Sequence, residues 1–354
     1  MVLFHTVHNW AESYIQGNHT GYGQWKGRKT TAEEIWDLYT GLRQSSLNNF
    51  SILVSGYIPN AEGVETVGKI GRDLKQRAST KPGSFFWVLD PVMGDQGRLY
   101  IPPDEVPAYK ALLYDADLIL PNQFEAELLS GTPITSTASI AAALASLHAT
   151  YHIPHIIITS VRLPPSPSAN AADDLQTLSI IGSTATSTLA PRPFRIDVPA
   201  FPVFFSGTGD MFAALAAFRL REAAAAAGVA DAPRWVSADA VPAADLPLAR
   251  AAARVLAAMQ AVLGKTFDAY AAALPRVEAE ARAAEKSGGA VPPDALRQAA
   301  VAKAAEVRVV RNVRDLVEPP DLEKYVVRPL EDLGESWSDG PVHGESGSGA
   351  GLSS

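Results

Sequence analysis

Short apolar runs alternate with helical patterns between residues 50 and 210, and this alternation constrains the fold more than any other feature of the chain. The segments between the runs, such as GVETVGKIGRDLKQRA and TASIAAALASLHAT, are long enough to cross over a sheet as helices. The pattern therefore predicts an α/β fold in which helices cover a parallel sheet. Four runs have the length and composition of buried strands: FSILVSGY (50–57), SFFWVLDP (84–91), ADLILPN (116–122) and PHIIITSV (154–161).

The pattern changes beyond residue 162. A helix is predicted from about Thr208 to Ala227, and Gly228 suits the left-handed position after its end. Two further strands, expected to be antiparallel, are LQTLSIIGS (175–183) and PFRIDVP (193–199). The other expected segments are a surface insertion (228–247), a long amphipathic helix (248–274), a late edge strand (306–312) and a disordered Gly/Ser-rich tail (332–354).

Composition narrows the class of protein. At 354 residues with 47% hydrophobic residues, the chain can bury a large core. Its net charge of -8 gives no electrostatic reason to expect a nucleic acid or an anionic membrane as partner. The absence of cysteine excludes disulfides and thiolate metal sites and fits a reducing compartment. We find no apolar run as long as a membrane span and no targeting signal, so we expect a cytoplasmic protein with a small-molecule substrate.

Polar residues gather where the predicted strands end. Because ligands of such sheets bind beyond the carboxyl ends of the strands, these residues should share one functional edge. Carboxylate and amide oxygens suit Mg²⁺, which is commonly shared with substrate phosphates. Any one residue could instead be a surface group, and the asparagine could simply cap the next helix. The residues are Asp90, Asp95, Asn122, Glu125, Thr159 and Ser160.

The loop SGTGD (206–210) lies between a predicted strand and a predicted helix. Its glycines allow backbone N–H groups to approach an anion, and the helix N-terminus adds partial positive charge. Asp210 could merely complement the helix dipole, or it could accept a proton from a substrate hydroxyl during phosphoryl transfer. The acidic cluster on the same edge favours the second interpretation. The loop lacks the G-x-G-x-x-G spacing of a dinucleotide-binding dehydrogenase.

Seven segments in order resemble the pyridoxal kinases of the ribokinase-like superfamily. They are GNHTGYGQWKG (17–27), SGY (55–57), DPVMGDQGRLYIP (90–102), PNQFEAELLSG (121–131), ITS (158–160), FSGTGD (205–210) and VRVVRNVRDL (307–316). The resemblance implies a three-layer α/β/α sandwich with a mostly parallel central sheet, in a single domain over residues 1–331. It also implies ATP-dependent phosphorylation of the 5'-hydroxymethyl group of pyridoxal, pyridoxine and pyridoxamine. Mg²⁺, a monovalent cation (K⁺ or Na⁺) and a homodimer are implied in the same way.

The resemblance also implies roles for individual residues. Asp210 corresponds to the catalytic base, and Gly207, Thr208 and Gly209 correspond to the anion hole around the transferred phosphoryl group. The positions near metal ions and phosphates are Asp90, Asp95 and Glu125. The nucleotide contacts are Asn122, Glu125, Thr159, Ser160, Phe201, Pro202, Val203 and Thr208, and the positions in the vitamer pocket are His19, Thr20 and Tyr57.

The N-terminus departs from the family pattern. Residues 1–16 show neither the glycines nor the buried-strand pattern of the family's first segment, S-x-V-x-x-G-Y-V-G-N, which supplies a serine to the pyridine ring. A truncated or wrongly defined start would explain this, as would a protein that lacks part of its pocket and a core strand, exposing the neighbouring strand edges. Leu120 also stands where a threonine is expected, which bears on cation binding.

Two alternatives to a pyridoxal kinase follow. One is a ribokinase-like kinase for another hydroxymethyl compound, such as a thiamin pyrimidine precursor. Such a kinase would share the phosphate chemistry and would differ from a pyridoxal kinase only in its acceptor pocket. NHTGYGQWKG (18–27) favours the pyridoxal branch. The other is a catalytically impaired protein that binds ATP or vitamers without the N-terminal segment. The retained Asp210 argues against it, because a protein that only binds needs no base.

Overall fold

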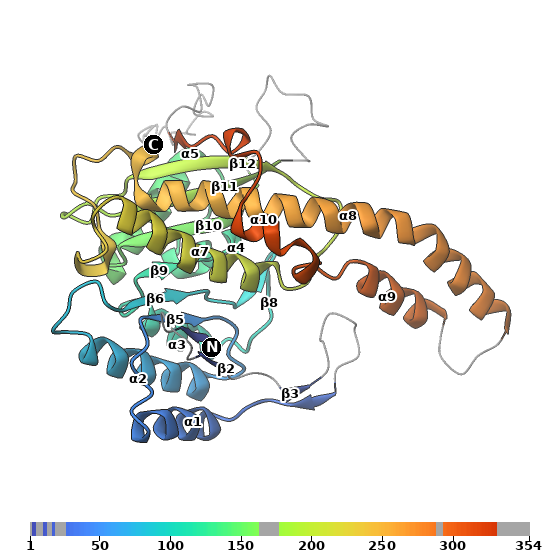
Figure 1. The fold of residues 1–354 in the computed structure, drawn as a ribbon, viewed down its shortest axis with the longest axis horizontal. Helices are drawn as coiled ribbons and strands as arrows, with labels where there is room; N and C mark the ends of the chain where they lie inside the picture. The colour runs from blue at the N-terminus through green and yellow to red at the C-terminus, as the bar shows by residue number, and fades with distance from the viewer. Residues whose placement is uncertain are drawn as a thin grey trace, which may run out of the picture.

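A nine-stranded mixed sheet forms the centre of the fold (Figure 1). The structure is a computed structural model that describes residues 2–4, 10–12, 16–17, 26–162, 177–287 and 293–330. The order across the sheet is β13-β12-β11-β10-β9-β6-β5-β1-β2. The strands are β1 (Val2–Phe4), β2 (Trp10–Glu12), β5 (Ile52–Ser55), β6 (Phe86–Leu89), β9 (Leu118–Ile119), β10 (His155–Val161), β11 (Thr177–Thr184), β12 (Pro193–Pro199) and β13 (Arg328–Pro329).

The four central strands β5, β6, β9 and β10 are parallel, and the strands on either side of them pair antiparallel. All four apolar runs predicted as strands are therefore confirmed, as is the antiparallel pair that follows them. Two short hairpins lie outside the main sheet: β3 (Gln16–Gly17) with β4 (Gly27–Arg28), and β7 (Gly94–Asp95) with β8 (Arg98–Leu99).

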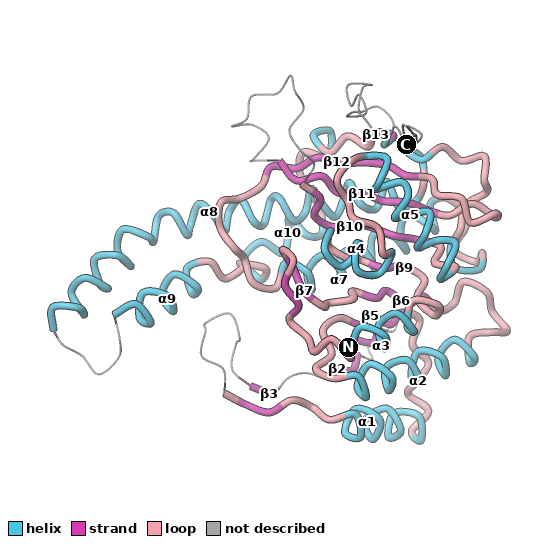
Figure 2. The backbone as a smooth tube through the Cα atoms, turned by 180° about the vertical axis from the view of Figure 1, so that it is seen from behind, coloured by secondary structure: helices cyan, strands magenta, loops and turns pink. Residues whose placement is uncertain are grey.

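Helices cover both faces of the sheet, which gives the three layers visible in Figures 1 and 2. Side chains of β6 alternate between two cores: Trp87 and Leu89 pack on one side, Phe86 and Val88 on the other. The helices of the first layer are α1 (Ala32–Gln44), α2 (Ala61–Arg77), α3 (Glu105–Leu112), α4 (Gln123–Ser130) and α5 (Thr137–Tyr151). Those of the second are α7 (Thr208–Ala226) and α8 (Pro247–Ser287).

The N-terminal segment takes part in the sheet, although its sequence has no buried-strand pattern. Strand β1 pairs antiparallel with β5, and β2 pairs with β1. The edge of β5 that a missing first strand would expose is thus covered by backbone hydrogen bonds.

Helix α8 is longer than expected, since it continues through Pro275 to Ser287 and projects from the body of the molecule (Figure 1). Helix α9 (Pro293–Ala304) folds back along it. The prediction of a strand at 306–312 is wrong. Val310–Asn312 form a 3-10 helix that leads into α10 (Val313–Val317), and the backbone N–H of Arg308 donates to Thr266 Oγ1 of α8 at 3.2 Å.

The segment 228–247, predicted to be a surface insertion, is partly buried. Trp235 is 3% exposed and stacks on Phe86 with ring centroids 4.0 Å apart. Its neighbour Arg234 donates from Nε to Asp117 Oδ1 at 2.6 Å. The segment contains 3-10 turns at Pro233–Trp235 and Ala243–Asp245, and another such turn lies at Leu322–Lys324. Trp235 contacts the first residue of β6, and Arg234 contacts the residue before β9. Segment 228–247 therefore covers the amino ends of these central strands, opposite the edge where the sequence predicts the site.

No helix among the described residues is both long and apolar enough to cross a membrane. The predicted tail, 332–354, lies outside the described residues.

Candidate active site

A cavity of about 570 Å³ lies at the carboxyl ends of the central strands. It brings together nearly all of the predicted site residues from segments far apart in the chain. Pro202 lines a neighbouring cavity instead, and His19 and Thr20 lie outside the described residues. The predicted residues that line the main cavity are Tyr57, Asp90, Asp95, Asn122, Glu125, Thr159, Ser160, Phe201, Val203, Gly207, Thr208, Gly209 and Asp210.

The glycine loop leads directly into helix α7. Gly207 is the residue before the helix and has a φ of 84°, a left-handed conformation that favours glycine. Within the described residues, no side-chain hydrogen bond caps this end, so the first backbone N–H groups of the helix are not used by a cap. Asp210 lies in the first turn. The geometry provides an anion site with a carboxylate beside it.

Glu125 is the most firmly held carboxylate of the site. Its Oε1 accepts hydrogen bonds from the backbone N–H groups of Met93 (2.8 Å) and Gly94 (3.3 Å), and Oε2 accepts from that of Asn122 (2.9 Å). Burial nevertheless raises the pKa of Glu125 to about 7, with a contribution from Asp95, while the three hydrogen bonds oppose the shift.

Asp90 follows strand β6 and lies against the glycine loop. Burial raises the pKa of Asp90 well above its ordinary value, and the charges of Glu125 and Asp210 raise it further. The site therefore disfavours the charged forms of these carboxyl groups, and a bound cation would offset that cost.

Asn122 has the capping role that the sequence left open, and its role as a nucleotide contact stays a prediction. Its side chain accepts from the N–H of Glu125 at 2.9 Å and so caps helix α4, in a reciprocal capping box. Its Nδ2 also donates to Gly94 O at 2.7 Å, and the residue lines the cavity. One carboxylate oxygen of Asp95 has a partner nearby in the chain, because Oδ1 accepts a hydrogen bond from the N–H of Gln96 at 2.8 Å.

The described residues contain no group of three or more His, Cys, Asp or Glu side chains placed to hold a metal by themselves. Asp90 and Glu125 still suit Mg²⁺, because both are carboxylates disfavoured in their charged form without a cation. Mg²⁺ commonly takes only one or two protein carboxylates and completes its shell with water and phosphate oxygens. Leu120, where a threonine was expected, is buried and adds an apolar surface to the cavity.

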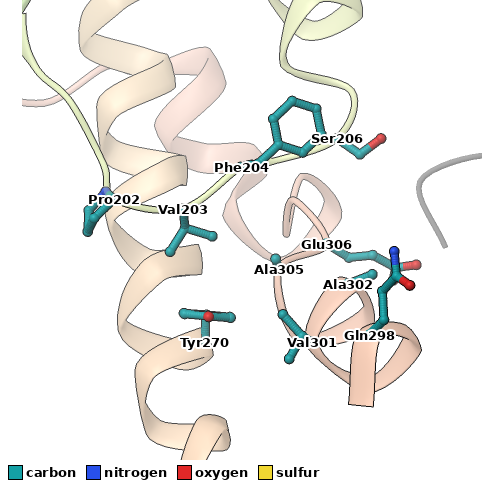
Figure 3. A pocket seen from close by; sticks show the side chains of 10 residues that line it. All are labelled: Pro202, Val203, Phe204, Ser206, Tyr270, Gln298, Val301, Ala302, Ala305 and Glu306. Atoms are coloured by element: carbon teal, nitrogen blue, oxygen red, sulfur yellow. The ribbon is translucent and has the colours of Figure 1, made fainter. Parts of the chain in front are cut away.

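A second cavity of about 320 Å³ adjoins the first along the loop 202–206 (Figure 3). Val203, Phe204 and Ser206 line both cavities. Tyr270 of α8 and Val301 of α9 face the loop from the other side (Figure 3). Helices α8 and α9 thus lie on one side of the loop 202–206, which precedes the glycines.

Several residues that line the main cavity were not predicted. Tyr100 lies within the segment 90–102 and Arg162 lies two residues after ITS (158–160), so their polar groups at strand ends could have drawn attention. Met259 and Gln260 come from helix α8, more than 45 residues after Asp210 in sequence, and no local pattern marks them. Only the packing of α8 over the sheet brings them to the site.

Three layers around a mixed sheet, with a glycine loop and carboxylates at the carboxyl ends of its parallel strands, define a ribokinase-like α/β protein. More narrowly, the chain belongs to the phosphomethylpyrimidine kinase family, whose model matches residues 56–250.

Named relatives agree with this assignment. Pyridoxal kinase of Homo sapiens is 35% identical over 207 residues, covering 56% of this chain and 63% of the relative. Pyridoxal kinase of Sus scrofa is 37% identical over 207 residues, covering 56% and 61%. This chain thus spans less than two thirds of the length of these curated relatives.

Solved structures share the fold. A pyridoxal kinase from Leishmania donovani in complex with ADP and pyridoxine has a TM-score of 0.62 at 25% identity, covering 88% of this chain and 85% of that one. A Plasmodium falciparum structure with AMP-PNP and PL has a TM-score of 0.57 at 21% identity, covering 86% and 83%. The predicted fold and the resemblance to pyridoxal kinases are therefore confirmed.

Proposed function

We propose that this protein is a pyridoxal kinase, which transfers the γ-phosphoryl group of ATP to the 5'-hydroxymethyl group of pyridoxal, pyridoxine or pyridoxamine. The observation that carries the proposal is the placement of Asp210 and the loop Gly207–Gly209 in one cavity with Asp90 and Glu125. The relatives named pyridoxal kinase, and the solved relatives with ADP or AMP-PNP, support the choice of substrates.

In this proposal, the oxygen of the 5'-hydroxyl group attacks the γ-phosphorus while Asp210 accepts the proton of that hydroxyl group. The bond from that phosphorus to the β,γ-bridging oxygen breaks, and ADP leaves. The backbone N–H groups of Gly207–Gly209 hold the charge that develops on the transferred group. Tyr57 lines the same cavity and would contact the vitamer ring.

The nucleotide would extend from the glycine loop along Thr159 and Ser160 towards the apolar end of the cavity, formed by Phe201, Val203 and Met259. Asp90 and Glu125 would hold Mg²⁺, which when bound neutralises phosphate charge. A monovalent cation, a homodimer and a cytoplasmic location remain predictions from the family resemblance and the composition.

A panel of acceptors tests the function. The purified chain is incubated with ATP, Mg²⁺ and one of four acceptors: pyridoxal, pyridoxine, pyridoxamine or 4-amino-5-hydroxymethyl-2-methylpyrimidine. ADP release and the mass of the product are measured. We expect phosphorylation of the three vitamers. Turnover of the pyrimidine alone would replace the proposal with the pyrimidine kinase, and binding of ATP without any turnover would show a protein that only binds.

A further inference from the structure

The segment Ser55–Ile58, which we call the acceptor turn, links strand β5 to the site. Tyr57 is 37% exposed and lines the main cavity. A β-carbon built on Gly56 would stand 4.0 Å from Oδ1 of Asp210. The backbone of the turn therefore lies directly beside the proposed base, where small shifts would change the distance between that base and an acceptor hydroxyl group.

A buried tyrosine on helix α3, which is not among the residues that line the cavity, holds the turn. The hydroxyl oxygen of Tyr109 accepts a hydrogen bond from the N–H of Ile58 at 3.1 Å, and the hydroxyl group donates to Gly56 O at 3.4 Å. These two backbone groups flank Tyr57. Tyr109 is fully buried, and burial raises the pKa of its hydroxyl group, so the group stays protonated and can donate.

The other end of the turn is fixed as well. Trp87 Nε1 donates to Ser55 Oγ at 2.8 Å, and the N–H of Asp90 donates to Ser55 O at 2.8 Å. The backbone leaves the sheet after Ser55, and among the described residues Gly56 and Tyr57 have no strand partner. At these residues the Tyr109 hydroxyl group takes the place of a sheet hydrogen bond.

We propose that Tyr109 is a positioning residue: through the acceptor turn, it sets where Tyr57 holds the acceptor substrate relative to Asp210. The inference rests on the proposed function. If Tyr109 only stabilised the fold, its substitution would lower the stability without changing the KM of one substrate more than that of the other. The two roles can therefore be distinguished.

The substitution Tyr109→Phe removes only the hydroxyl group and keeps the ring in the core. Tyr39→Phe is the matched control. Tyr39 is also buried, its hydroxyl group donates to Asp73 and accepts from Asn48 Nδ2, and it lies on helix α1, outside the cavity lining. We expect Tyr109→Phe to raise the KM for pyridoxal by about threefold to tenfold, the size of a lost hydrogen bond, with the KM for ATP unchanged. Tyr39→Phe should lower Tm to a similar extent and change neither KM.

An unchanged KM for pyridoxal in Tyr109→Phe, or an equal rise in both KM values, would overturn the inference. Hydrogen exchange of the peptide that contains residues 55–60 is measured in parallel, because it does not depend on turnover. Should the unmodified chain phosphorylate nothing, the proposed function fails. Faster exchange in Tyr109→Phe but not in Tyr39→Phe would then still support the hold on the turn, and equal exchange would refute it.

Discussion

Asp90 and Gly209 approach so closely that a β-carbon on Gly209 would stand 3.3 Å from Oδ2 of Asp90. This contact joins the two halves of the candidate site, since Asp90 follows strand β6 and Gly209 lies in the first turn of α7. Because Gly209 has no side chain, the Asp90 carboxylate lies directly against the backbone of the loop. The anion loop and the acidic cluster can therefore act on one phosphate group.

Gly209→Ala should therefore lower activity with little loss of stability. The added methyl group pushes against the Asp90 carboxylate and shifts the loop, and we expect kcat/KM to fall by at least about tenfold. The better helix propensity of alanine offsets part of the strain, so Tm should change little. Gly41→Ala is the control, because a β-carbon there meets nothing within 4 Å. It should gain up to about 1 kcal/mol of stability and keep full activity, and equal activity in the two variants would contradict the account.

Stability should depend on pH through Asp90. Its folded pKa lies well above the unfolded value of 3.8, so the folded chain favours the protonated form. Above pH 3.8 the unfolded chain loses this proton while the folded chain retains it, and the free energy of unfolding falls as the pH rises towards the folded pKa. Asp90→Asn carries no such charge, so in a chelator it should be more stable than the unmodified chain at pH 8, with a smaller difference at pH 5.

Thermal unfolding at pH 5, 6, 7 and 8 measures this difference. Asp37→Asn, on an exposed position of α1, is the control for removing a carboxylate outside the site, and it is measured at the same four pH values. Mg²⁺ at pH 8 should raise the Tm of the unmodified chain more than that of Asp90→Asn, because the cation relieves the repulsion among the carboxylates. A stability difference that stays constant with pH would contradict the role assigned to Asp90.

Trp235→Ala should destabilise the fold without altering the site. The ring stacks on Phe86 at an interplanar angle of 8°, and Nε1 donates to Gly83 O at 3.0 Å. Losing a buried tryptophan costs about 3–5 kcal/mol, which denaturant unfolding would detect. Trp235→Phe keeps an aromatic ring and should cost less. Both variants should keep normal KM values while folded, and a raised KM in Trp235→Phe would show that this end of the sheet reaches the site.

The parts of the fold that follow from local sequence were predictable. Strand β6 could be predicted because Phe86–Leu89 are four consecutive apolar residues, and in the structure their side chains do face both cores. Residues 307–310, VRVV, have strand-like composition, but the strand that pairs with the outer edge of β12 is Arg328–Pro329. Val310 is 88% exposed, so composition alone misled the prediction there.

Long-range packing determined what the sequence could not show. Strand β1 is held by its pairing with β5 rather than by any pattern of its own. Trp235 lies in a segment of loop-like composition, and its burial depends on Phe86, far away in the chain. Gln260 and Tyr109 similarly reach or support the site only through the arrangement of α8 and α3. The glycine loop and the acidic cluster were predictable because their chemistry is local to short motifs.

The central claim is that Asp210 is the base in phosphoryl transfer to a vitamer hydroxyl group. Single-turnover formation of pyridoxal 5'-phosphate is measured for the unmodified chain and for Asp210→Asn, with ATP affinity determined separately by calorimetry. The account predicts a rate at least about a hundredfold lower in Asp210→Asn with ATP affinity retained. A near-normal rate in Asp210→Asn would contradict it.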